Sequence, residues 1–326
     1  MDQVIPRGSL FIVNNSRVIA SRLHGNLNTG ARIEILLLEP SLDAEPGSNQ
    51  WLCIGKPMKK LRVGSQIAFS DNLNAVVIKL ADEPSSGPMP FLIKFNLSCD
   101  ELLTWLDRQG EMPLPPYISR KDADPDQHNR DRKNYQTVYS KDLGSVAAPT
   151  AGLHFTEALM RRLQNLNCEF AHVTLHIGAG TFLPVKTQDP KLHTMHSERF
   201  LVPRQTLEAI SKAHKNSRPV IVVGTTAFRS LEGLAHIAAQ RKCSLDDLAD
   251  QWLRTDIFIR PNLFTDRFRP WAAHYLMTNF HQPESTLFML ICALVGFEKA
   301  HYIYSDAVNQ GYRLFSYGDS SLLSVR

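Results

Sequence analysis

The chain has few cysteines and no long hydrophobic run, and both absences limit what it can be. Its five cysteines are scattered over 326 residues with no Cys-x-x-Cys pair, which argues against a disulfide framework or a structural zinc site and favours a reducing cytoplasm. The longest apolar run, residues 287–297, is far shorter than a membrane span. The first residues also lack the basic and then apolar pattern of a secretion signal. We therefore expect a cytoplasmic protein with no membrane partner.

A strong charge and the common nucleotide-binding motifs are missing as well. The formal net charge is only +4, which permits a nucleic-acid partner without predicting one. No Gly-x-Gly-x-x-Gly or Walker pattern opens a predicted helix, so the sequence gives little support to a dinucleotide or P-loop site. An apolar fraction of 43% and a charged fraction of 21% are typical of a globular protein.

The first hundred residues or so are predicted to form an antiparallel β structure. Evenly spaced β-rich runs separated by turn residues are typical of an antiparallel sheet or a small barrel. A short helix is expected over residues 100–108, and residues 120–134 are so polar that they predict an exposed, mobile connector. The predicted strands cover residues 10–13, 31–39, 51–54, 66–69, 75–80 and 91–96.

The second half of the chain alternates strands with helices. Such alternation indicates an α/β layered domain. The predicted strands cover residues 170–177, 219–223 and 256–259, and the predicted helices cover residues 156–167, 204–216, 226–241, 286–295 and 298–309.

Residues 144–156, between the two halves, form the most unusual segment. They are nearly free of charge and rich in small residues, and His154 is their one titratable side chain. Pro149 and Gly152 disfavour a regular helix or strand, and small side chains let a ligand approach the backbone closely. We interpret the segment as a binding loop.

Further segments of the second half carry residues suited to a site. Residues 176–182 follow a predicted strand with two glycines, and residues 195–198 place an imidazole two positions from a carboxylate. Residues 224–232 leave a strand and enter a helix, where free N–H groups and the hydroxyls of Thr225 and Thr226 suit an anionic or oxygen-rich ligand group. A Gly-Thr-Thr sequence before a helix is, however, more often only an N-cap.

Together these segments resemble the S-adenosylmethionine:tRNA ribosyltransferase-isomerase family of queuosine biosynthesis. The matching segments come in the family's order and span essentially the whole chain. They are residues 14–23, 135–139, 144–156, 172–182, 195–198, 224–232, 255–259, 278–289 and 315–319.

The resemblance implies a reaction. The family transfers the ribosyl part of S-adenosylmethionine to the aminomethyl group of 7-aminomethyl-7-deazaguanine, which already sits at the wobble position of tRNA. Adenine and methionine leave, and the sugar rearranges to give epoxyqueuosine. S-adenosylmethionine is thus a consumed substrate, and the resemblance implies no cofactor.

The resemblance also implies a fold and a division into domains. The fold class is α/β, with an α/β domain around a distorted β-barrel and an inserted small antiparallel β domain. In this chain the main catalytic domain would comprise residues 1–13 and 141–326, and the insert residues 14–140. We expect a monomer.

The implied reaction requires a base for the carbon next to the sulfonium and benefits from an acid for the departing adenine. His154 is the first candidate, and the alternative is a histidine held by backbone carbonyls. His196 with Glu198 is the second, and the alternative is a surface turn. His281 is the third, and the alternative is a loop that only caps the following helix.

The substrate-binding candidates come from the same segments. Arg229 and Glu232, three apart on a helix, fit ligand contact and a structural ion pair equally well. Asp256 fits either a ribose contact or an ordered turn. The full set is Pro149, Thr150, Ala151, Gly152, Phe155, His176, Gly178, Gly180, Thr181, Phe182, Thr225, Thr226, Arg229, Glu232, Asp256, Asn279 and Phe280.

Contacts with tRNA are expected from the polar connector. Basic side chains there suit phosphate contacts, which position an RNA without reading its sequence, although a solvated loop explains them about as well. The candidates are Arg120, Lys121, Arg130, Arg132 and Lys133.

Two other hypotheses remain open. Family members usually begin some tens of residues earlier, so one alternative is a shortened homologue that binds RNA or a nucleoside without catalysis. The other is a metallohydrolase, since His172 and His176 share a strand face at metal-ligand spacing. No carboxylate or cysteine completes that histidine set, so we expect no metal.

Overall fold

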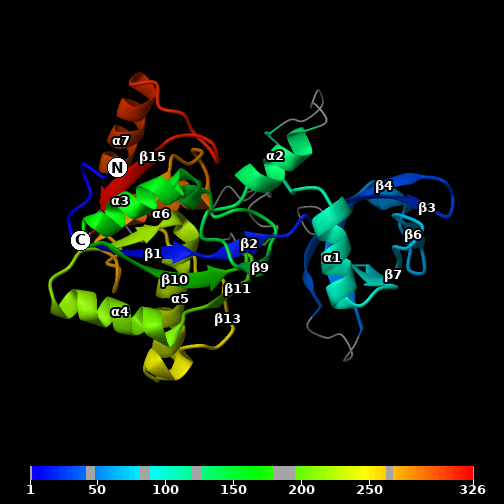
Figure 1. Ribbon diagram of the computed structural model, residues 1–326, viewed down its shortest axis with the longest axis horizontal. Coiled ribbons are helices and arrows are strands. Elements are labelled where there is room, and N and C mark those ends of the chain that lie inside the picture. The colour runs from blue at the N-terminus through cyan, green and yellow to red at the C-terminus, as the bar shows by residue number, and fades with distance from the viewer. Residues whose placement is uncertain are drawn as a thin grey trace.

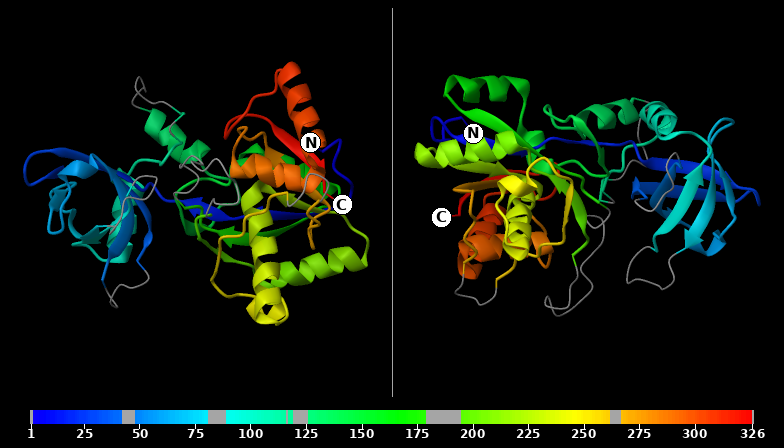
Figure 2. Two further views of the ribbon diagram at one scale, coloured as in Figure 1. Left: turned by 180° about the vertical axis from the view of Figure 1, so that it is seen from behind. Right: turned by 90° about the horizontal axis from the view of Figure 1, so that it is seen from below.

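The computed structural model describes residues 2–41, 48–80, 89–115, 117–118, 126–178, 195–261 and 267–325. Figure 1 shows two parts side by side, a sheet flanked by helices and a β-barrel. The chain starts in the sheet, crosses to build the barrel, and returns to complete the sheet, as the two further views in Figure 2 also show.

The barrel is closed by six antiparallel strands in the order β3-β4-β5-β8-β7-β6. Alternate side chains of each strand fill its interior, as Ile33, Ile35 and Leu37 of β4 do. Helix α1 (Cys99–Gln109) adds two leucines to the same core, and Ser98 caps its first turn. The strands are β3 (Arg22–Leu27), β4 (Arg32–Pro40), β5 (Gln50–Lys56), β6 (Gln66–Ala68), β7 (Asn74–Leu80) and β8 (Phe91–Phe95), with a short helix η1 (Met58–Lys60).

The sheet has seven strands in the order β13-β11-β10-β1-β12-β14-β15. Its four central strands, β10, β1, β12 and β14, run parallel, and the outer three are antiparallel to their neighbours. Strands β1 and β12 are buried along their whole length, which explains their continuous apolar sequence. The strands are β1 (Leu10–Asn14), β10 (Glu169–Leu175), β11 (Glu198–Leu201), β12 (Val220–Val223), β13 (Leu253–Thr255), β14 (Tyr275–Asn279) and β15 (Ser320–Ser324).

Helices cover both faces of this sheet (Figure 1). Phe11 and Val13 of β1 pack in one core with α3 and the short helix η2, whereas Leu10 and Ile12 pack in the other with α4, α5 and α6. The helices are η2 (Thr150–His154), α3 (Glu157–Asn165), α4 (Arg204–Lys215), α5 (Gly224–Arg241), η5 (Asp246–Leu248), α6 (Thr286–Val295) and α7 (Phe297–Asn309). No single helix of the described residues is long and apolar enough to cross a membrane; only α6 and α7 together, bent by 115°, meet that test of length and composition.

Two connections hold the barrel beside the sheet. Strand β2 (Ser16–Val18) leaves the sheet toward the barrel and pairs in parallel with β9 (Asp142–Ser145), which brings the chain back. An ion pair also joins the two parts, since Arg254 of β13 contacts Glu39 of β4 with 3.0 Å between Nη2 and Oε1.

The predicted fold class, α/β with an inserted antiparallel β unit, is confirmed. The closed barrel is this inserted unit, while the main part is built on the seven-stranded sheet. The six strands and one helix predicted in the first hundred residues or so are all present, with shifts of one or two residues at their ends.

Two local predictions are wrong. The strand expected over residues 256–259 lies earlier, as β13, because Leu253 and Thr255 supply the buried alternation. The polar connector is not a mobile loop over its second half, where helix α2 (Gln127–Asn134) forms. Asp131 of α2 is buried, and the Arg132 guanidinium donates to the carbonyls of Asp107 and Gly110 at the end of α1. A polar side chain of this segment therefore serves to bind the backbone at the end of α1.

Candidate active site

The candidate site follows the carboxyl ends of the four parallel strands. In α/β sheets ligands bind at this edge, where the connections of neighbouring strands leave on opposite faces. The connection after β1 includes α3 on one face, and the connection after its neighbour β12 is α5 on the other. Strands lie about 4.8 Å apart, so the edge from β10 to β14 is roughly 14 Å long. That length suits a nucleoside with an amino-acid tail.

Asn14 ties the middle of this edge together. Its Oδ1 accepts from the backbone N–H of Leu175 at 3.0 Å, and its Nδ2 donates to the Leu175 carbonyl at 3.0 Å and to Thr226 Oγ1 at 3.2 Å. Asn14 is fully buried and links β1, β10 and the first turn of α5. We did not predict it as a site residue, although a polar residue directly after a buried apolar strand was a usable signal.

Helix α5 begins at this edge without a side-chain cap. Gly224 has a φ of +84°, and a Cβ built there would lie 3.5 Å from Ala151 of η2. The N-cap residue of α5 is Val223, whose side chain accepts no hydrogen bond from the first N–H groups of the helix. The first N–H groups of α5 and its positive dipole end therefore suit an anionic or oxygen-rich group.

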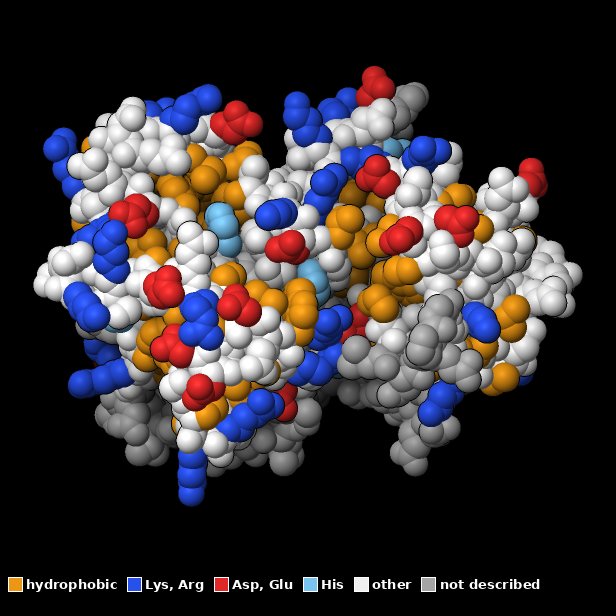
Figure 3. All heavy atoms as spheres, turned by 60° about the horizontal axis from the view of Figure 1, so that its bottom comes forward, with side chains coloured by type: hydrophobic (Ala, Val, Ile, Leu, Met, Phe, Trp, Pro, Cys, Tyr) orange, Lys and Arg blue, Asp and Glu red, His pale blue; other side chains and the backbone are white. Residues whose placement is uncertain are grey.

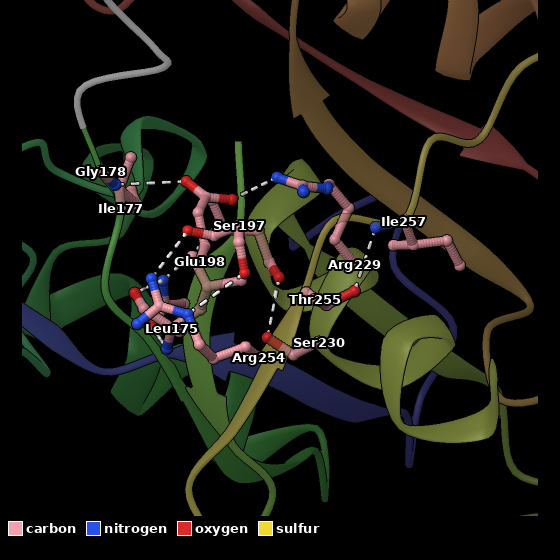
Figure 4. Close-up of polar contacts among 12 residues, drawn as sticks. Leu175, Ile177, Gly178, Ser197, Glu198, Arg229, Ser230, Arg254, Thr255 and Ile257 are labelled. Carbon is pink, nitrogen blue, oxygen red and sulfur yellow. Dashed lines mark hydrogen bonds and ion pairs between the residues drawn. The ribbon is translucent and has the colours of Figure 1, made fainter. Parts of the chain in front are cut away.

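A buried ion pair stands at the β10 end of the edge (Figure 4). Arg229 of α5 donates from Nη1 to Glu198 Oε2, and Glu198 Oε1 accepts from the Gly178 N–H at 3.2 Å. The two side chains are 9% and 8% exposed. Within the described residues, Arg229 Nε and Nη2 have no hydrogen-bond partner. The ion pair between Arg229 and Glu198 thus links α5 to β11.

A cavity of about 210 Å³ opens beside Glu198, between the barrel and the sheet. Trp51 and Glu39 line it from the barrel, and Gly144, His176 and Glu198 line it from the sheet part. Figure 3 shows one face of this junction, where hydrophobic side chains gather on both parts with histidines nearby. The cavity is therefore built by both parts of the molecule.

His176 is fixed by its neighbours in this cavity. Its ring stacks on Trp252, with centroids 5.0 Å apart and an angle of 21° between the planes. The Arg199 guanidinium lies 4.7 Å from the Trp252 ring centre. Burial, helped by Arg199, lowers the pKa of His176 to about 4, so the imidazole is neutral at pH 7.

Gly144 makes room for that imidazole, which leads to a testable expectation. A Cβ at Gly144 would lie 2.6 Å from His176 ring atoms, and its φ of +149° disfavours other residues. We expect Gly144→Ala to lower the free energy of unfolding in urea by about 1–3 kcal/mol. Gly30→Ala is the matched control, because Gly30 also has a positive φ but has open space around it. Equal losses in both variants would contradict a packing role for Gly144.

His154 and Asn279 meet at the β14 end of the edge. Asn279 Nδ2 lies 3.3 Å from His154 Nε2, and it also donates to the carbonyls of Phe315 at 3.0 Å and Ser316 at 3.4 Å. An amide has only two N–H groups for these three possible acceptors, so at least one N–H is shared between two of them. Burial lowers the pKa of His154, with Asp319 opposing that shift. A neutral imidazole with a lone pair to offer is a suitable base.

His281 makes its polar contacts with Thr278 and Tyr304. Its Nε2 lies 2.9 Å from Thr278 Oγ1, and its backbone N–H donates to Tyr304 Oη at 3.1 Å. Burial lowers the pKa of His281 from 6.5 to about 4. The loop also caps a helix as the alternative expected, since Ser285 Oγ accepts from the Phe288 N–H at 3.1 Å.

This pKa shift predicts a loss of stability in acid. The unfolded chain binds a proton at His281 below pH 6.5, whereas the folded chain binds it only near pH 4, so stability present above pH 6.5 is lost as the pH falls to 4. The shift corresponds to about 3 kcal/mol. We expect His281→Gln to remove that part of the pH dependence in urea titrations at pH 7 and pH 4. His236→Gln, at an exposed histidine, is the control; an unchanged pH dependence in His281→Gln would contradict the assignment.

The binding loop divides into buried and accessible residues. Ala151 and Phe155 belong to the core beneath α3, and a Cβ at Gly152 would lie 2.1 Å from Tyr139 Oη. Pro149 is buried too, and Thr150 is half-buried. His154 is half-buried, so the one titratable group of the segment remains partly accessible.

The remaining candidates are scattered. His196 is exposed on the rim of the cavity, while the Glu198 carboxylate is engaged by Arg229 and Gly178. Asp256 is exposed just after β13, and Glu232 is buried on α5.

Phe280 packs against Tyr304 and Tyr312, with centroids 5.4 and 5.7 Å away. The predictions at Gly180, Thr181 and Phe182 lie outside the described residues.

The basic candidates for tRNA contact are also divided. Arg130 and Lys133 are exposed on α2, whereas Arg132 holds α2 against the end of α1. Arg120 and Lys121 lie outside the described residues.

The described part of the chain contains no group of three or more His, Cys, Asp or Glu that could hold a metal ion. His172 is half-buried, and burial lowers its pKa, opposed by the nearby Asp142.

The known proteins that are similar to this chain include two relatives and one solved structure. A protein named S-adenosylmethionine:tRNA ribosyltransferase-isomerase from Treponema denticola is 39% identical over 323 residues, which cover 99% of this chain and 87% of that protein. A protein of the same name from Dinoroseobacter shibae is 43% identical over 330 residues, covering 99% of this chain and 86% of its own. A crystal structure of an S-adenosylmethionine tRNA ribosyltransferase from Thermotoga maritima matches with a TM-score of 0.45 and 27% identity, over 98% of this chain and 84% of that one.

A family model described as queuosine biosynthesis protein matches residues 1–323. That match runs through the sheet, the barrel and every described part of the candidate site. The chain belongs to the queuosine biosynthesis protein family.

Proposed function

We propose that the protein transfers and isomerises the ribosyl moiety of S-adenosylmethionine onto 7-aminomethyl-7-deazaguanine at the tRNA wobble position. The products are epoxyqueuosine-tRNA, adenine and methionine. The observation that carries the proposal is the family match over residues 1–323, together with relatives of about 40% identity that bear the ribosyltransferase-isomerase name.

The geometry of the sheet edge supports this reaction. The edge is long enough for an extended sulfonium nucleoside, and the uncapped start of α5 suits oxygen-rich or anionic groups of that substrate. In our proposal His154 is the base that removes the proton from the carbon next to the sulfonium. Its lowered pKa keeps it neutral at pH 7, and the sulfonium acidifies that carbon enough for a modest base.

We assign supporting roles to the other predicted residues. The Glu198 carboxylate already accepts two hydrogen bonds, so it holds Arg229 and Gly178 in place and leaves proton transfer to others. His176, neutral and stacked on Trp252, forms a wall of the cavity. His196 is exposed at the rim of the cavity, where it contacts a substrate that enters from solvent.

The proposal includes the partners and the setting of the enzyme. The tRNA meets Arg130 and Lys133 on the exposed side of α2. We further propose that the enzyme works as a monomer in the cytoplasm and needs no cofactor besides the consumed S-adenosylmethionine. Sedimentation of the purified protein and elemental analysis test the first and last of these points.

One incubation tests the proposed reaction. The protein is mixed with S-adenosylmethionine and tRNA carrying the deazaguanine precursor, and the products are separated by chromatography. We expect free adenine, free methionine and an epoxyqueuosine nucleoside in the tRNA digest. Unmodified tRNA with a guanosine at the wobble position is the control and yields none of them. Tight tRNA binding with neither product contradicts the proposal and favours the binding-protein alternative.

A further inference from the structure

Three exposed aromatic side chains gather beside the β14 end of the site. Tyr117, Phe315 and Tyr317 are 53%, 36% and 41% exposed. The rings of Tyr117 and Phe315 lie against each other, with centroids 4.9 Å apart and an angle of 31°. The ring of Tyr317 packs against that of the buried Tyr135, with centroids 6.3 Å apart. Large aromatic surface left in water at one place indicates a binding partner.

The backbone holds these rings in a defined position. Phe315 has a φ of +75°, which is rare for a residue with a bulky side chain. Its N–H donates to the Phe280 carbonyl at 3.1 Å, and its carbonyl accepts from Asn279 Nδ2 at 3.0 Å. The loop is thereby fixed to the same asparagine that lies next to His154.

Tyr117 is fixed to this loop from the far side. Its Oη lies 2.5 Å from Ser316 Oγ and accepts from the Ser316 N–H at 3.3 Å. Tyr117 comes from the chain that leads back from the barrel, and Phe315 from the loop before β15. Two distant segments therefore build one rigid aromatic surface, which is preorganised for a flat ligand.

We propose that Tyr117 and Phe315 form a stacking platform for an unpaired nucleobase of the RNA substrate. Every base has a π-face, so exposed aromatic rings bind unpaired bases of RNA by stacking. This inference rests on the proposed function, since it gives the tRNA a contact beside His154. It adds residues that neither the sequence motifs nor the comparisons assign to a ligand.

The charge next to the platform fits an RNA. Helix α2, with Arg130 and Lys133 exposed, ends at the residue before Tyr135. The ring of Tyr135 packs against that of Tyr317. Burial raises the pKa of the Tyr135 phenol, and the nearby Tyr117 and Tyr317 raise it further. Positive side chains that hold phosphates beside rings that stack bases are the usual combination for single-stranded RNA.

Fluorescence of a modified RNA tests the platform. An anticodon stem-loop RNA is made with 2-aminopurine at one loop position at a time and titrated with the full-length protein. We expect the fluorescence at one position to be quenched on binding. Phe315→Leu and Tyr117→Leu abolish that quenching and raise the Kd for the RNA about 5- to 150-fold, the range expected for one stacked base.

Matched variants separate stacking from folding. Tyr117→Phe keeps the ring and loses only the hydroxyl, so quenching persists, and Tyr302→Leu removes an exposed tyrosine of α7 and leaves the Kd within about twofold. Affinity for S-adenosylmethionine, measured alone, stays unchanged in all four variants. If Phe315→Leu shows the same quenching and the same Kd for the RNA as the wild type, the platform is contradicted. Lack of adenine release by the wild-type enzyme counts against the proposed function instead, so the two failures are distinct.

Discussion

Replacement of His154 by Gln slows adenine release about 10²- to 10⁴-fold, which is the contribution expected of a general base. Glutamine preserves much of the side-chain volume and can still contact Asn279, but it cannot take a proton. His154 is half-buried, and the two amide hydrogens of Asn279 are shared between its ring and the carbonyls of Phe315 and Ser316. We therefore expect the Kd for S-adenosylmethionine, from equilibrium titration, to change little.

The pH profile provides a second reading of the same residue. Burial lowers the pKa of His154 below 6.5, so the base form prevails above that pH and the rate falls only at lower pH. In His154→Gln this acid limb disappears. His301→Gln, at an exposed histidine of α7, is the matched control. A large rise in Kd with an unchanged rate at saturation would mean that His154 only shapes the wall.

Sequence patterns predicted the elements that depend on local chemistry, whereas β2, β3, β9, β14 and β15 were not predicted. The buried strands β1 and β12 are continuous apolar runs, and the Thr156 side chain caps α3 as expected. The short strands β11 and β13 were missed or misplaced, since their pairing is decided by residues far away in the chain. Helix α2 was missed because its stability comes from the bonds of Arg132 to the end of α1.

The site was predictable as a set of segments, and its pairing was not. The sequence placed Glu198 with His196 and Arg229 with Glu232, because those residues are close along the chain. Folding instead brings Glu198 of β11 to Arg229 of α5, 31 residues apart. Asn14 lay in a matching segment but was given no role, and Tyr117 lay in none; their roles arise from contacts with Leu175 and Ser316 in other elements.

Replacement of Arg229 by Met has the largest expected effect on stability. Methionine fills similar space but leaves the Glu198 carboxylate buried at 8% exposure without its cation. Removing one member of a buried ion pair costs about 3–5 kcal/mol, because the remaining charge is uncompensated. We expect that loss in the free energy of unfolding, measured by urea denaturation at pH 7. Without Arg229 the Glu198 side chain is held less firmly. We therefore expect Gly178, whose N–H donates to Glu198, and the sheet edge beside β10 to become less ordered.

The double variant Glu198→Gln/Arg229→Met separates charge from packing. Glutamine can still accept from the Gly178 N–H but needs no cation, so the double variant should recover most of the stability lost in Arg229→Met. Arg254→Met is a matched control, because its ion pair with Glu39 is about one-third exposed and an exposed pair contributes about 1 kcal/mol or less. A loss in Arg229→Met no larger than in Arg254→Met contradicts the buried pair as a stabilising element. If the double variant is as stable as the wild type yet releases adenine slowly, the ion pair serves to place Gly178 and the start of α5 at the sheet edge.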